Sequence, residues 1–193
     1  MSQPYEISYI PFCRQFEGNI CHMYLDSDTP GNVTTGNGFL IPSATAACTF
    51  PFYLPGLHTP ATAQEIEAEW KRVKAMQPGH VPAFYANLTA LQLRQEDIDS
   101  HLLSLLDQSD DELQKDYSGF ETFPDSVKMA LLDMDYNLGD SKLRTTYPHF
   151  DAAIDRRDWE TAATQCDRID VQPSRNAWCA KQFNGQTETI GIV

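Results

Sequence analysis

The sequence predicts an α+β fold that is mostly helical, with a small β-hairpin lobe and a larger helical lobe. Apolar residues recur at helical spacing over most of the chain, and one early stretch places turn-forming residues between two short apolar runs. A chain of 193 residues with 41% hydrophobic content can bury the core of one domain or of a two-lobed domain. We therefore expect a single domain over residues 1–193. Its hairpin lobe would span about 18–90, its helical lobe about 1–17 and 91–183, and a polar tail 184–193.

The first expected element is a helix that ends close to Glu17. Its apolar face consists of Tyr9, Phe12, Cys13, Phe16 and Ile20. Pro11 stands early enough in this pattern to be tolerated in a first helical turn. Because the C-terminal end of a helix dipole does not stabilise an anion, Glu17 in a partly apolar cleft would tend to keep its proton.

A β-hairpin is expected next. Residues 21–25 form its first strand, and residues 26–32 (Asp-Ser-Asp-Thr-Pro-Gly-Asn) are dense in turn formers. Residues 33–35 form the return strand. Gly36 and Gly38 then permit a tight backbone close to a ligand.

The rest of the chain is expected to be mainly helical. Thr62 and Glu65 form a capping box at the start of one helix, and Ser109 and Glu112 form a second box before another. Further apolar stripes run from Ile98 to Leu106 and from Val127 to Leu138. Gly139 fits the C-cap of the helix that precedes it. The Pro-rich segment 42–60 has no periodicity, and it fits either a loop on the substrate side or an ordered loop packed into the core.

Glu17, Asp26 and Thr34 are the candidates for chemistry. They bring two carboxylates and a hydroxyl from two elements that would face one cleft. Hydrolysis of a glycosidic bond needs two carboxyl groups, one to donate a proton to the leaving oxygen and one to activate water or attack the anomeric carbon. A simpler interpretation fits the same residues: a surface glutamate followed by an Asp-rich turn.

These residues belong to longer motifs that resemble the phage-type lysozymes, glycoside hydrolase family twenty-four. The motifs are Glu17-Gly18 at a helix end, Tyr24-Leu25-Asp26 on the first strand, and Thr34-Thr35-Gly36-Asn37-Gly38 on the return. The similarity continues from Phe123 to Gly139, which resembles the family's central buried helix. Residues 147–154 and 157–163 resemble two of its shorter helices, and Pro173-Ser174-Arg175 resembles the start of its last helix. The chain departs from the family in a longer hairpin, in Phe39 where a histidine is common, and in the segment 42–87.

The resemblance implies a lysozyme-like, two-lobed fold and a muramidase activity. Such an enzyme cleaves the β-1,4 bond between N-acetylmuramic acid and N-acetylglucosamine in peptidoglycan glycan strands, with inversion. Glu17 would protonate the leaving oxygen, and Asp26 would activate water with the help of Thr34. Arg175 would hold Glu17 in place. No cofactor and no metal are expected.

The expected substrate-binding residues are Gly36, Asn37 and Gly38. Two points about this site stay open. The longer hairpin makes Asp28 a neighbouring candidate for the second carboxylate. Hydrolysis of chitin or chitosan is possible on the same fold, and so is a non-catalytic wall-binding or structural module.

The charge of the chain limits its partners. A formal net charge of −13 and a pI of about 4.6 make nucleic acid an improbable partner. A negative protein gains no long-range attraction to an anionic wall, but its charge suits a basic partner such as a cognate immunity or inhibitor protein. Simple solubility would also explain it. We expect a monomer.

The expected location follows from two further features. No run of about twenty apolar residues is present, so no membrane span is expected. Residues 1–4 lack the basic region and apolar core of a Sec signal. We expect synthesis in a bacterial cytoplasm and action in the periplasm or wall of a target or host cell, as an antibacterial effector delivered by type VI secretion or as a phage endolysin.

The five cysteines are expected to be structural. Cys13, Cys166 and Cys179 lie on apolar helix faces, and Cys21 and Cys48 complete the set. Their spacing shows no CxxC pattern and no metal-ligand arrangement with histidine. An oxidising periplasm would permit one or two disulfides, leaving at least one thiol free.

Overall fold

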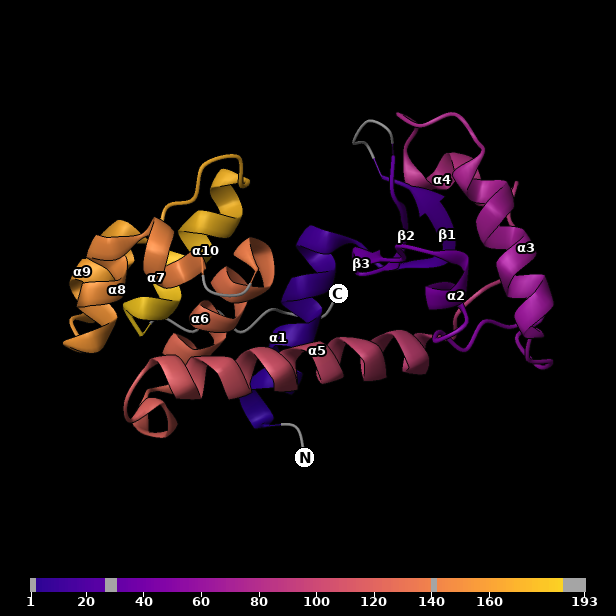
Figure 1. The fold of residues 1–193 in the computed structure, drawn as a ribbon. Helices are drawn as coiled ribbons and strands as arrows, with labels where there is room; N and C mark the ends of the chain where they lie inside the picture. The colour runs from indigo at the N-terminus through magenta and orange to yellow at the C-terminus, as the bar shows by residue number, and fades with distance from the viewer. Residues whose placement is uncertain (1–2, 27–30, 140–141, 186–193) are drawn as a thin grey trace. The chain divides into compact units, whose positions relative to one another are not determined.

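The computed structural model describes residues 3–26, 31–139 and 142–185, and the chain forms two compact units (Figure 1). The hairpin unit comprises Pro11–Leu102, and the helical unit comprises Met1–Ile10 together with Leu103–Val193. Both boundaries fall inside helices, so that α1 (Pro4–Glu17) and α5 (Gln95–Asp116) each belong to both units. The described residues form an α+β structure that is mostly helical, which confirms the coarse class; the lysozyme-like lobes stay a prediction.

Helix α1 is present as expected, but it begins earlier than the apolar pattern indicated. Pro11 therefore lies in the middle of the helix and not in its first turn. A proline there leaves the carbonyl of Ile7 without its usual amide donor. Ile7 is 55% exposed and Pro11 is also exposed, so water can take the place of the missing amide.

The hairpin unit is built on a three-stranded antiparallel sheet of β1 (Ile20–Leu25), β2 (Val33–Gly36) and β3 (Phe39–Leu40), in that order. The strand β3 was not expected from the sequence. Tyr24 lies opposite Thr34, whereas the register between β1 and β2 shifts on the way to Ile20. The hydroxyl of Thr35 lies 3.3 Å from the carbonyl oxygen of Ile20 and 3.2 Å from that of His22, so it can donate to either where the ladder is irregular.

Short helices accompany this sheet: α2 (Ala44–Ala47), α3 (Ala63–Lys74) and α4 (Pro82–Tyr85). Figure 1 shows α3 and α4 beside β1. The predicted capping box of Thr62 and Glu65 is confirmed at the start of α3. A buried Glu69 on α3 accepts hydrogen bonds from the amides of Ala90 and Leu91, which fixes the segment that precedes α5.

The Pro-rich segment 42–60 is ordered and contributes to the core of the hairpin unit. Phe50 and Phe52 are buried in it. Tyr53 forms β-bridges with Pro60 and Gln92, so the segment is tied to the chain that leads into α5. The interpretation as a core-packing loop is therefore confirmed.

The helical unit contains η1 (Phe120–Thr122), α6 (Asp125–Leu138), α7 (Lys142–Thr146), α8 (Pro148–Asp155), α9 (Trp159–Gln165) and α10 (Pro173–Phe183). Helix α10 packs against α6 and α9. Val127, Ala130, Leu131 and Met134 of α6 are fully buried, as the apolar stripe predicted. Gly139 ends α6 at a φ of 79°, a conformation that favours glycine.

Helix α5 corrects one prediction. The second capping box, Ser109 to Glu112, does not start a helix, because α5 runs through it without interruption. Leu106 and Leu113 are both buried, so the apolar stripe continues across these polar residues. Asp110 accepts a hydrogen bond from Gln114 at 2.5 Å and another from the hydroxyl of Tyr5.

All five cysteines are free thiols, and Cys13, Cys166 and Cys179 are buried as predicted. Among the described residues, no helix combines the length and apolar character that crossing a bilayer requires. Within the same part of the chain, no group of three or more His, Cys, Asp or Glu side chains is arranged to hold a metal ion.

Candidate active site in the hairpin unit

Glu17 is the last residue of α1, and the following Gly18, at a φ of 79°, turns the chain into β1. Gly38 lies beside it from the turn between β2 and β3. A Cβ at Gly38 would stand 3.6 Å from Oε2 of Glu17, and the φ of 83° at Gly38 favours glycine. The backbone of this turn therefore runs directly beside the Glu17 carboxylate.

Asn37 explains how the turn keeps this position. Its side chain is completely buried, and its amide nitrogen donates a hydrogen bond to the carbonyl oxygen of Gly18. The contact fastens the turn between β2 and β3 to the end of α1. Asn37 thus positions the residues around Glu17. The substrate contacts expected of Gly36, Asn37 and Gly38 stay predictions.

Asp26 follows β1 directly and is held by Asn32 across the hairpin. The amide N–H of Asn32 donates to Oδ1 of Asp26 at 2.7 Å, and its side-chain Nδ2 donates to Oδ2 at 3.0 Å. A carboxylate offers about four acceptor positions, so these two bonds leave room for a water or a ligand hydroxyl. Asp28, the other candidate for this role, lies outside the described residues.

Thr34 is buried at the β2 position opposite Tyr24. Opposed residues in an antiparallel pair project to the same face of the sheet, so Thr34 shares a face with Tyr24. The Thr34 hydroxyl lies 3.3 Å from the carbonyl oxygen of Asn32, within reach of a hydrogen bond. Thr34 is thus in contact with the residue that orients Asp26.

Tyr24 connects the two candidate carboxylates electrostatically. Burial raises the pKa of its hydroxyl above the ordinary value, and the negative charges of Asp26 and Glu17 raise it further. Both candidate carboxylates therefore act in the same direction on this pKa.

Arg175 has a partner that the sequence did not indicate. Within the helical unit its Nε donates to Oδ1 of Asp133 at 2.9 Å. Arg168 donates to Oδ2 of the same carboxylate at 2.6 Å, and the hydroxyl of Tyr9 donates to Oδ1 at 2.7 Å. The predicted pairing of Arg175 with Glu17 joins residues of different units and stays a prediction. A single acid in the apolar run from Ala130 to Met134 is the signal that could have revealed the role of Asp133.

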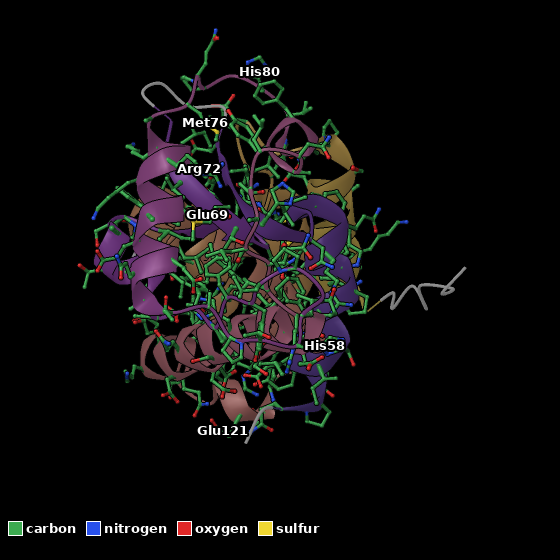
Figure 2. All side chains as sticks on the ribbon, turned by 90° about the vertical axis from the view of Figure 1, so that its right-hand side faces the viewer. His58, Glu69, Arg72, Met76, His80 and Glu121 are labelled. Carbon is green, nitrogen blue, oxygen red and sulfur yellow. The ribbon has the colours of Figure 1, made fainter. Side chains whose placement is uncertain are left out.

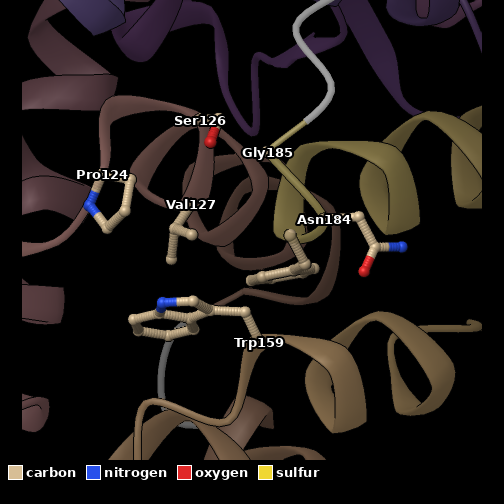
Figure 3. Close-up of a pocket in the computed structure, with 7 residues that line it drawn as sticks. Pro124, Ser126, Val127, Trp159, Asn184 and Gly185 are labelled. Carbon is tan, nitrogen blue, oxygen red and sulfur yellow. The ribbon is translucent and has the colours of Figure 1, made fainter.

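A cavity of about 290 Å³ lies in the helical unit beside α6 and Trp159 (Figure 3). Its lining residues are Pro124, Ser126, Val127, Trp159, Phe183, Asn184 and Gly185. None of these seven side chains is acidic, basic or a thiol. These seven residues therefore offer no group for general acid–base catalysis, in contrast to the region around Glu17 and Asp26.

Comparison of the chain with protein-family models gives no match, and comparison with curated proteins gives none either. The class of protein is accordingly inferred from the residues of the hairpin unit and from the motifs that they form.

Proposed function

We propose that the protein is a peptidoglycan hydrolase, a muramidase that cleaves the β-1,4 bond between N-acetylmuramic acid and N-acetylglucosamine. The observation that carries the proposal is that the turn at Gly38 runs beside the Glu17 carboxylate, while Asn32 fixes Asp26 by both of its oxygens in the same compact unit. Glycoside hydrolysis requires two carboxyl groups, one to donate a proton and one to activate water.

In this proposal each residue has one role. Glu17 donates its proton to the glycosidic oxygen as the bond to the anomeric carbon breaks. Asp26, held by Asn32, orients a water molecule and takes a proton from it. The water oxygen attacks the anomeric carbon from the face of the sugar opposite to the leaving group. Thr34 assists in placing that water. The pairing of Arg175 with Glu17 is implied by the family resemblance alone and has no part in these roles.

A second candidate is a non-catalytic wall-binding module, and one observation favours it. Both oxygens of Asp26 accept hydrogen bonds from Asn32, an arrangement that also serves simply to close a hairpin. Fold alone does not decide between these two functions.

The direct experiment incubates purified sacculi with the protein and identifies the released fragments by mass. A muramidase releases disaccharide peptides that end in reducing N-acetylmuramic acid. Fragments that end in reducing N-acetylglucosamine would point to the other glycosidic bond, and the absence of fragments, with the protein bound, would favour the wall-binding module. Purified chitin serves as the substrate for the chitinase alternative.

The biological setting is part of the proposal. An antibacterial effector and an endolysin would both lyse cells when directed to the periplasm. Only an effector needs a cognate inhibitor, because an endolysin is meant to lyse its host. Co-expression of small periplasmic proteins encoded beside this chain distinguishes the two: rescue of the cells with binding to the enzyme favours the effector, and the lack of both favours the endolysin.

A further inference from the structure

The distribution of charge along the hairpin unit is uneven. The whole chain contains 27 acidic and 14 basic residues, yet no acidic residue lies between Glu69 and Glu96. This interval contains Lys71, Arg72, Lys74 and Arg94 and also His80. A protein with a net charge of −13 thus carries a stretch of 26 residues (70–95) whose charged groups are all cationic. Acidic side chains outside the stretch pair with three of these cations, Glu67 with Lys71, Glu69 with Arg72 and Glu96 with Arg94, whereas Lys74 donates to a backbone carbonyl oxygen.

Exposed apolar side chains concentrate in the same interval. The described residues include six large hydrophobic side chains that are exposed, and three of them, Val81, Phe84 and Leu88, lie within eight positions of one another. Val81 is 70% exposed and Phe84 is 44% exposed. The ring of His80 stacks on that of Phe84 with centroids 3.9 Å apart. Clustered exposed apolar groups are typical of interaction sites, whereas scattered ones are not.

Two contacts tie the end of α3 to the segment that carries the exposed apolar side chains. The guanidinium of Arg72 donates to the carbonyl oxygen of Leu88, and the hydroxyl of Tyr85 donates to that of Gln77 at 2.8 Å. Figure 2 shows Glu69 and Arg72 in succession along α3, Met76 past the end of this helix, and His80 beyond it. We use the name α3–α4 surface for Lys71, Lys74, His80, Val81, Phe84 and Leu88.

The α3–α4 surface adjoins the candidate active site. Nζ of Lys74 donates to the carbonyl oxygen of Gly31 at 2.6 Å. The next residue, Asn32, is the one that holds the Asp26 carboxylate. An ammonium group has three donors, so Lys74 can bind an anion while it keeps this contact.

We propose that the α3–α4 surface binds the acidic stem peptides of the wall polymer and holds the glycan strand beside Asp26. This inference rests on the proposed function. Lys71 and Lys74 supply the charges for peptide carboxylates, and Phe84 with His80 supplies apolar contact area. The side chain of Lys71 is 65% exposed and forms an ion pair with Glu67 at 3.3 Å; an exposed pair of this kind is weak, so Lys71 can exchange Glu67 for a carboxylate of the ligand. Lys74 contacts the residue before Asn32, so a ligand held here lies close to a residue proposed for hydrolysis, which favours the wall polymer over a bilayer. The surface gives an acidic enzyme the local attraction to an anionic substrate that its net charge denies it.

The test measures binding of the full chain carrying Glu17→Gln, so that the polymer stays intact, to purified sacculi by co-sedimentation at low salt. We expect Lys71→Glu with Lys74→Glu to weaken binding about tenfold, the sum of two charge contacts of ordinary strength. Lys115→Glu with Arg156→Glu, two exposed positions of the helical unit, changes the net charge equally and should leave binding within about twofold. Phe84→Ser should weaken binding, whereas Ile169→Ser, at a position that is 85% exposed, should not.

Several results would overturn the proposal. The first is binding to sacculi that is unchanged when Lys71 and Lys74 are replaced. The second is an equal loss of binding in the charge-matched control. The third is a loss of binding on replacing Lys71 and Lys74 that is just as large for glycan strands stripped of stem peptides. Binding to anionic lipid vesicles but not to sacculi would assign the surface to a membrane instead. Circular dichroism checks folding, and the milder Lys71→Gln with Lys74→Gln pair gives the same comparison if the reversals unfold the chain.

Failure of this inference and failure of the proposed function are distinguishable. If the unmodified protein releases fragments and replacing Lys71 and Lys74 leaves binding unchanged, only the inference about the α3–α4 surface is wrong. Binding that depends on these lysines, with no fragment release, overturns hydrolysis alone.

Discussion

Asn32 holds Asp26 by both of its carboxylate oxygens, with donor–acceptor distances of 2.7 and 3.0 Å. The Asp26 amide in turn donates to the carbonyl oxygen of Asn32 at 2.9 Å. The carboxylate at the end of β1 is therefore fixed in orientation by a residue on the other side of the hairpin. Such a fixed carboxylate suits a group that has to orient a water molecule.

The first prediction concerns this second carboxylate. Asp26→Asn keeps the shape of the side chain but removes the base, so we expect turnover on sacculi to fall at least about a hundredfold. Asn32→Ala should cost less, because Asp26 keeps its charge and one backbone donor. Asp28→Asn is the matched control and should have a small effect. A larger loss in the Asp28 variant than in the Asp26 variant would give Asp28 the catalytic role.

The second prediction concerns Asp133, whose single carboxylate pairs with two buried arginines. Asp133→Ala leaves the charges of Arg168 and Arg175 without this partner in a buried setting. We expect a loss of about 3–5 kcal/mol in the free energy of unfolding, measured by urea denaturation. Asp155→Ala removes an exposed partner of Arg144 in the same unit and should cost less than about 1 kcal/mol. Similar losses for both variants would show that the buried arrangement around Asp133 contributes little.

The third prediction concerns Glu6, which is 1% exposed. Burial raises its pKa, and the charges of Asp107 and Asp110 raise it further against the opposing hydrogen bond from the Gln3 amide, to about 7. The folded state therefore binds a proton more tightly than the unfolded state, whose glutamate titrates near 4.3. The stabilisation by this proton is complete below the unfolded pKa and is lost as the pH rises through about 7.

Glu6→Gln should remove this dependence. We expect the melting temperature of the Gln variant to exceed that of the unmodified protein by a few degrees at pH 8, and the difference to shrink toward pH 5. Glu121→Gln, at an exposed position, should show no such trend. A difference that grows toward acid pH would contradict the raised pKa.

Local sequence signals predicted the fold wherever they agreed with the tertiary contacts. The capping box of Thr62 and Glu65 starts α3 as expected, and Gly139 ends α6. The box from Ser109 to Glu112 failed because the buried Leu106 and Leu113 carry one helix across it. A capping motif is a local preference that a continuous apolar face can override.

In the candidate site, too, local motifs indicated some residues, whereas their distant partners came only from the structure. Motif spacing indicated Glu17, Asp26 and Thr34 as candidates. It did not indicate that Asn32 binds both oxygens of Asp26, nor that Arg175 binds Asp133. Arg175 and Asp133 are 42 positions apart, and no periodicity or turn rule relates residues at that separation.

The fourth prediction is stereochemical. The family resemblance implies inversion, for which the two carboxyl groups stand about 6.5–9.5 Å apart so that a water fits between Asp26 and the sugar. Cleavage of a β-1,4 bond should then release the α-anomer first, which prompt NMR of the products can detect. Initial release of the β-anomer would indicate a retaining mechanism.

The central claim is that Glu17 is the proton donor, and one comparison tests it most directly. Glu17→Gln keeps the size of the side chain and removes the transferable proton, while Glu96→Gln makes the same change at a side chain that is 73% exposed in the same unit. We predict that solubilisation of purified sacculi falls at least about a hundredfold in the Glu17 variant and is unchanged in the Glu96 variant, with equal melting temperatures. Solubilisation by the Glu17 variant at the rate of the unmodified protein would contradict the account.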